Sequence, residues 1–205
     1  MKRSSLVVVI VLLALAAVAQ VPTMPSFSAD MAMKASARDR AMTGKMYMGA
    51  GKMRMDMTNE GGKVSMITDP GKKTSYMVMH DQRMYMELGA GGPMNPMQRG
   101  PKMPDVKPVS GDSPCAGRAG VTCTKAGSEM MNGRMCDRWE IASSNKSEAG
   151  TMWIDQKTHM PIKTAMQDGS SWELMNFKEG PQDASLFAPP AGYEKFDMGA
   201  MMRQR

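Results

Sequence analysis

The sequence predicts a mainly β protein built from antiparallel strands, with little helix. Methionine makes up 28 of 205 residues, and many of the methionines lie two positions apart. A spacing of two places side chains on one face of a β-strand. The segments that hold them are short and end at Gly, Pro, Asn and Asp clusters. After residue 22, no long segment repeats its apolar residues at the helical spacing. This alternation is typical of strands with one buried and one solvated face.

The chain begins with the pattern of a secretory signal peptide, which we place at residues 1–22. Lys2 and Arg3 precede the apolar run Leu6–Val18, which ends in small residues. That run is shorter than the ~20 residues that a bilayer span requires, although an uncleaved anchor is the alternative. Removal of the leader lowers the formal charge from +6 to +4. Basic residues are scattered and aromatics are few, so a nucleic-acid partner is not expected.

We expect residues 23–197 to form a single β domain whose first part is a meander. Alternation begins at residues 27–34, and a hairpin turn at Gly49-Ala50-Gly51 separates two methionine-bearing strands. The face opposite their methionines carries Lys45, Lys52 and Arg54, and Arg83, at the start of a later predicted strand, is expected on the same face. The meander then continues through three further predicted strands, at residues 63–68, 75–79 and 83–88.

Residues 89–114 are rich in Gly and Pro and keep no period, so we predict a mobile loop, either disordered or a lid over the sheet. Strands resume around Asn132-Gly133, a strong type I′ hairpin signal. Further strands are predicted at residues 134–141, 151–154, 162–167 and 172–177. Residues 183–187 are expected to form one helical turn, and residues 198–205 a frayed tail.

The order of these motifs resembles a family of secreted bacterial proteins of unknown function within the lipoprotein-carrier (LolA/LolB-like) superfamily. The resemblance spans about residues 27–196 and rests on short pieces: Gly44–Met48, Lys52–Met55, Tyr76–His80, Met84–Glu87, Asn132–Arg134, Trp139-Glu140, Trp153–Asp155, Pro161–Lys163, Leu186-Phe187 and Pro190–Tyr193. It implies an incomplete antiparallel β-barrel, a LolA/LolB-like half-barrel, with a concave apolar face. In the carriers that face accepts acyl chains.

Nine methionines are the candidate ligand-binding residues: Met46, Met48, Met53, Met55, Met57, Met77, Met79, Met84 and Met86. Methionine has no special preference for strands, where β-branched residues fit better. Three interpretations are open: apolar core filling, an adaptable groove for hydrophobic ligands, and Cu(I) or Ag(I) binding by Met-x-Met pairs. His80 and His159 are expected to be turn residues, so no metal ligand is assigned.

Three cysteines in an exported protein predict one disulfide and one free thiol. With Asn132-Gly133 as the turn, Cys136 opposes Glu129, and Cys123 opposes Ala142 far along the strand. Cys123 and Cys136 are then too far apart to form a disulfide with each other. We therefore expect a Cys115–Cys123 disulfide, unless a bulge at Gly127 changes the register. Cys136 alternates with Arg134 and Arg138, which suggests an exposed free thiol.

No motif predicts catalysis. Gly111-Asp112-Ser113 lies in the Pro-rich segment without an identifiable His partner, and no glycine loop has phosphate-binding spacing. Trp139, Trp153 and Trp172 are expected to be core anchors.

The sequence therefore predicts a periplasmic or secreted, non-enzymatic protein without a cofactor. Its expected partner is a lipid, a lipoprotein or another hydrophobic ligand, and its oligomeric state is left open. The alternatives are soft-metal binding and a methionine-based oxidant sink.

Overall fold

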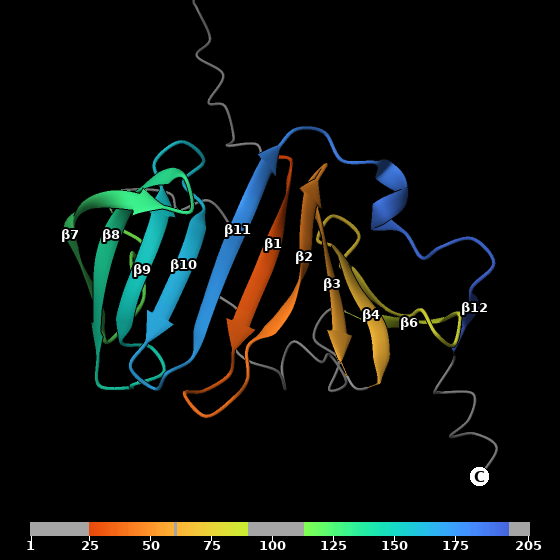
Figure 1. Ribbon diagram of the computed structural model, residues 1–205, viewed down its shortest axis with the longest axis horizontal. Coiled ribbons are helices and arrows are strands. Elements are labelled where there is room, and N and C mark those ends of the chain that lie inside the picture. Colours follow the sequence, from red (N-terminus) through yellow and green to blue (C-terminus); the bar gives the residue numbers. More distant parts are fainter. Residues whose placement is uncertain (1–24, 60, 90–112, 197–205) are drawn as a thin grey trace, which may run out of the picture.

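One open sheet organises the protein, whose computed structural model describes residues 25–59, 61–89 and 113–196. Its strands are β1 (Phe27–Lys34), β2 (Met42–Gly49), β3 (Lys52–Asn59), β4 (Gly62–Asp69), β5 (Thr74–Met79), β6 (Met84–Gly89), β7 (Val121–Met131), β8 (Arg134–Ser143), β9 (Gly150–Asp155), β10 (Pro161–Met166), β11 (Ser171–Glu179) and β12 (Glu194–Lys195). Their spatial order is β12-β6-β5-β4-β3-β2-β1-β11-β10-β9-β8-β7. Strands β7 and β12 stand at opposite ends, so the sheet does not close (Figure 1).

Strands β2 to β6 form the predicted antiparallel meander, in which each strand pairs with the next along the chain. Ala50 and Gly51 form a two-residue turn between β2 and β3, and both have positive φ, at 50° and 71°. Asn132 and Gly133 connect β7 and β8 with φ of 51° and 77°. A type I′ turn requires positive φ at both central residues, and its twist matches that of the flanking strands. The hairpin expected at Asn132-Gly133 is confirmed.

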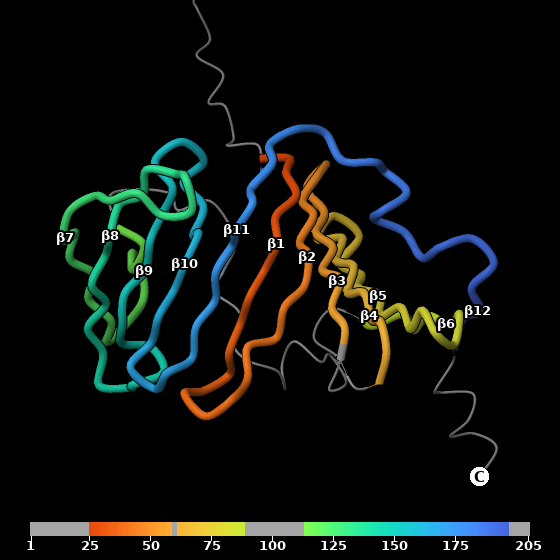
Figure 2. Tube along the Cα trace, in the orientation of Figure 1, coloured from red at the N-terminus to blue at the C-terminus, as the bar shows by residue number. Residues whose placement is uncertain are grey.

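The two halves of the chain meet where β1 pairs with β11. Met31 lies opposite Leu174 and Met33 opposite Trp172, although these strands are far apart in the sequence. Figure 2 shows this junction as a red segment beside a blue one, near the middle of the sheet. The pairing makes one continuous sheet from two meanders, with all neighbours antiparallel except β12 and β6.

The C-terminal segment leaves β11, passes over the strands of the first meander and ends at the sheet edge (Figure 1). It contains the 3-10 turn η1 (Ala184–Phe187), which confirms the helical turn expected there. The side chain of Asp183 accepts a hydrogen bond from the amide of Ser185 and caps this turn. Beyond it, β12 pairs in parallel with β6.

The main core contains buried side chains from both halves of the sheet. They are Phe27, Ala29, Met31, Met33, Met46, Met48, Met55, Met66, Leu88, Cys136, Met160, Ile162, Trp172 and Leu174. The mainly β, unclosed fold with little helix that the sequence predicts is confirmed. In the part of the chain that the structure describes, no helix is long and apolar enough to cross a bilayer. The expected leader and tail, and nearly all of the 89–114 loop, lie outside the described residues.

Candidate ligand-binding face

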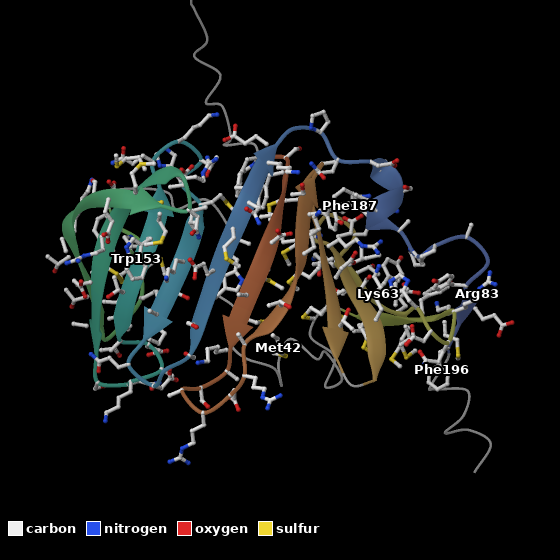
Figure 3. All side chains as sticks on the ribbon, viewed as in Figure 1. Met42, Lys63, Arg83, Trp153, Phe187 and Phe196 are labelled. Carbon is white, nitrogen blue, oxygen red and sulfur yellow. A yellow bond between two sulfur atoms is a disulfide. The ribbon has the colours of Figure 1, made fainter. Side chains whose placement is uncertain are left out.

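All nine candidate methionines lie on one face of the sheet, which we call the methionine face. Directly opposed residues of paired strands point to the same face. One row crosses five strands with methionine at every position: Met46, Met55, Met66, Met77 and Met86. A second row contains Met57, Val64, Met79 and Met84, and a third begins with Met48 and Met53. Figure 3 shows sulfur atoms recurring along this half of the sheet.

Burial changes along the methionine face. Met46, Met48 and Met55 on β2 and β3 are almost fully buried, with exposed fractions of 0%, 1% and 1%. The methionines of β5 and β6 are all half-buried: Met77, Met79, Met84 and Met86. Met53 and Met57, which also lie on β3, are half-buried as well. The face is therefore closed core at Met46, Met48 and Met55 and partly open apolar surface at Met53, at Met57 and along β5 and β6.

Aromatic side chains support the closed part of the face. Phe27 on β1 is fully buried, lies opposite Met48 and stacks on Phe177 with ring centroids 4.2 Å apart. The guanidinium of Arg134 covers Phe177 at 4.3 Å from the ring centroid. Trp172, with 2% of its surface exposed, belongs to the same core. These rigid rings adjoin flexible thioethers, so the open part of the face can adapt while its base remains fixed.

The opposite face of the first meander is not simply solvated, contrary to our expectation. Lys45 and Lys52 do lie on this face, but Arg54 has only 7% of its surface exposed. A second small core forms here from Ile67, Val78 and Phe187, with Tyr47, Tyr76, Tyr85, Leu186 and Tyr193 packed against it. It forms because η1 and the following segment cover the strands, which local alternation could not reveal. Arg83, expected on a strand of this face, lies in the β5–β6 turn at a φ of 52°.

A polar network links that second core to the C-terminal segment. Ser65 donates its hydroxyl proton to Asp56 at 2.6 Å, and its oxygen accepts from Arg54 at 3.0 Å. The Nε2 of His80 forms a hydrogen bond with the same oxygen at 2.7 Å, and its Nδ1 forms one with the hydroxyl of Tyr193 at 3.0 Å. The network therefore joins β3, β4 and the end of β5 to the C-terminal segment.

The surroundings of His80 favour its neutral form. Burial lowers the pKa of His80, and the charges of Lys63 and Arg54 lower it further. Arg54 also donates to the carbonyl oxygen of Leu186 at 3.1 Å, which ties η1 to the sheet. His80 lies in a turn, as expected, and His159 lies in the connection between β9 and β10, where its φ is 56° and its amide donates to the carbonyl oxygen of Asp155.

The predicted disulfide between Cys115 and Cys123 is confirmed, with Cα atoms 5.6 Å apart. The register near the turn is also as expected, since Cys136 opposes Glu129. Farther along the strand, Cys123 opposes Ile141 rather than the predicted Ala142. The cause is a bulge at Gly127, where φ is 130° and one residue is left unpaired.

Cys136 is a free thiol, but the expectation that it is exposed was wrong, because its exposed fraction is 0%. Burial raises the pKa of Cys136 to about 11, and the nearby Asp155 carboxylate raises it further. The alternation with Arg134 misled the prediction. Arg134 forms a largely buried ion pair with Asp155 at 2.8 Å, so it marks an enclosed surface. A protonated, buried thiol of this kind is unreactive.

The remaining candidates do not assemble into a site. Trp172 is a core anchor, whereas Trp153 is half-buried and donates to Glu129 at 2.6 Å, and Trp139 is also half-buried. Gly111 and Asp112 lie outside the described residues, and Ser113 accepts from the amide of Cys115. Within residues 25–59, 61–89 and 113–196, no three His, Cys, Asp or Glu side chains are grouped to hold a metal ion.

The fold and this face define an open β-sheet protein with an apolar face, and comparisons with known proteins show what the fold is similar to. The profile of a domain of unknown function, DUF4412, matches residues 27–99, the segment that contains the whole methionine face. No curated protein matches the chain.

Solved structures share the fold at low sequence identity. MucB has a TM-score of 0.55 and 12% identity, over 86% of this chain and 61% of that chain. An uncharacterized conserved protein from Thermus thermophilus has a TM-score of 0.54 and 11% identity, over 84% and 90% of the two chains. The Pseudomonas aeruginosa MucA/MucB complex gives 0.51 and 11%, over 81% and 56%. This chain thus spans less than two thirds of MucB. These likenesses confirm the fold class that the resemblance predicted.

Proposed function

We propose that this protein is an exported, non-catalytic binding protein that holds an apolar ligand, such as an acyl chain of a lipid or lipoprotein, on its methionine face. The observation that carries the proposal is the gradient of burial along that face. Met46, Met48 and Met55 form closed core, whereas Met57 on β3 and the methionines of β5 and β6 remain partly open. Flexible thioethers suit apolar ligands of varied shape.

Other observations support the location and the class of partner. The Cys115–Cys123 disulfide fits an oxidising compartment such as the periplasm, in agreement with the signal-peptide pattern. MucB, which shares the fold, has been solved in complex with MucA(peri), so a segment of another protein is a second candidate for the apolar ligand.

Titration with fatty acids of graded length tests the proposal. Each methylene buried on the face contributes about 0.8 kcal/mol, so two extra carbons should tighten binding about tenfold or more until the surface is full. Replacement of Met53, Met55 and Met57 by Leu should preserve most of the affinity, because apolar area is retained. Affinity that does not change with chain length would contradict the proposal.

A pair of neighbouring residues provides a matched test of location. Met57 and Thr58 are adjacent on β3, and the first lies half-buried on the methionine face while the second is exposed on the other. Met57→Asp places a charge against the ligand and should abolish binding, whereas Thr58→Asp should leave binding unchanged. Circular dichroism of both variants checks that they are folded. Equal losses in the two folded variants would place the ligand elsewhere.

A further inference from the structure

Two hairpins of the sheet carry the same arrangement of four methionines. On β2 and β3, Met46 faces Met55 and Met48 faces Met53. On β5 and β6, Met77 faces Met86 and Met79 faces Met84. We call the second set the β5–β6 quartet. Each quartet is a Met-x-Met pair opposed by another Met-x-Met pair on the neighbouring strand.

The spacing of the β5–β6 quartet allows its four sulfurs to converge. Directly opposed residues of antiparallel strands have Cβ atoms about 4.5–5.5 Å apart, and residues two apart on a strand are roughly 7 Å apart. Each thioether sulfur is two bonds beyond Cβ on an unbranched side chain, so it can lean toward the centre of this rectangle. A single ion above the hairpin is within reach of all four side chains.

Burial separates the two quartets. In the first quartet only Met53 is half-buried, and Met46, Met48 and Met55 are held in the core beside Phe27, so the four sulfurs are not available together to an ion from solvent. All members of the β5–β6 quartet are half-buried, at the end of the sheet where the methionine face is partly open. Of the two quartets, only this one combines four thioethers with access from solvent.

The donor atoms determine which ion would bind. Neutral thioethers are soft ligands that suit Cu(I) and Ag(I), whereas Zn(II) prefers nitrogen, thiolate and carboxylate donors. His80 follows Met79 directly, but its two ring nitrogens contact Ser65 and Tyr193 on the far side of the sheet. Thioethers do not titrate near neutral pH, so a site made from them holds its ion without proton competition.

We propose that Met77, Met79, Met84 and Met86 form a binding site for one soft monovalent ion, Cu(I) or Ag(I). This site goes beyond the acyl-binding role and does not depend on it. It differs from the general Met-x-Met hypothesis because burial assigns it to one hairpin.

Silver titration tests the assignment, since Ag(I) needs no reductant and leaves the Cys115–Cys123 disulfide intact. The titration uses the purified full chain in chloride-free buffer, with Cys136→Ala in every protein to remove the one free thiol. Resonances of methionine ε-methyl groups labelled with ¹³C report which sulfurs bind. We expect one equivalent of Ag(I) to shift the four quartet resonances selectively.

Two matched variants decide the result. Changing all four β5–β6 quartet residues to Leu should weaken Ag(I) binding by at least about tenfold. The same change at Met46, Met48, Met53 and Met55 should leave it intact, and Leu keeps the core volume close to that of Met. Binding that survives the first change, or that the second change removes, would overturn the proposal, as would a wild-type protein that takes up no silver.

Fatty-acid titration of the β5–β6 Leu variant keeps this proposal separate from the acyl-binding role. Leu preserves apolar surface, so the variant should still bind fatty acids while it loses silver. Loss of silver alone supports the metal site, and absence of fatty-acid binding in both proteins contradicts only the proposed function.

Discussion

Replacing methionines at the two ends of the burial gradient should have unequal effects on stability. Met55 has an exposed fraction of 1% and lies between Met46 and Met66 in the longest methionine row. Truncation of such a side chain removes its transfer free energy and leaves a cavity, so Met55→Ala should lower the free energy of unfolding by about 2–4 kcal/mol. Met79 is half-buried, and water can fill the space left by Met79→Ala. Its loss should be only about 1 kcal/mol, roughly half of the transfer free energy of a buried Met.

Urea unfolding followed by circular dichroism measures both variants against the wild-type protein. Met55→Leu is the control, because it retains volume and should cost less than about 1.5 kcal/mol. Similar losses for Met55→Ala and Met79→Ala would mean that the face is uniformly buried. That result would remove the structural basis for placing a ligand, or a metal ion, at β5 and β6.

Two predictions concern the cysteines, and a third concerns His80. Replacing Cys115 and Cys123 by Ala should lower the free energy of unfolding by about 2–3 kcal/mol in the chain-entropy model, and urea unfolding measures this. In the wild-type protein Cys136 should react with iodoacetamide only after denaturation, because burial keeps the thiol protonated and covered. Rapid labelling of the folded protein would contradict this prediction. The lowered pKa of His80 means that the unfolded chain takes up a proton first, so stability should fall as the pH drops below about 6.5 and level off below the pKa of the folded state. His80→Gln should flatten this pH dependence, and an unchanged slope would show that another group causes it.

Local pattern was sufficient for much of the fold because strand periodicity and turn chemistry act over a few residues. Met-x-Met spacing placed all nine candidate methionines on one face, and the paired register agrees. Asn132-Gly133 marked a hairpin, since few other residue pairs adopt positive φ at both positions. The Cys115–Cys123 disulfide followed from that register and survived an error of one residue at the Gly127 bulge.

The failures arose where a distant segment changed the surroundings of a residue. Cys136 was expected to be exposed because it lies two residues from Arg134 and so on the same face of its strand. Arg134, however, forms an ion pair with the buried Asp155, and Cys136 is itself fully buried. Arg54 was expected to face solvent, yet the carbonyl oxygen of Leu186, far along the chain, accepts its hydrogen bond. A charged residue in a strand therefore marks a solvated face only when no later segment packs against it.

By itself the sequence determined most of the strands, the methionine face and the cysteine pair, because these depend mainly on side-chain direction and turn geometry over a few residues. Tertiary structure alone decided that β1 pairs with β11, that η1 covers the opposite face, and which methionines are closed and which are open. The two methionine quartets show why. They have the same spacing and the same register, but three members of the first quartet are buried in the core with Phe27, whereas all four members of the β5–β6 quartet are half-buried. Burial depends on contacts between segments far apart in the chain, and no local period encodes those contacts.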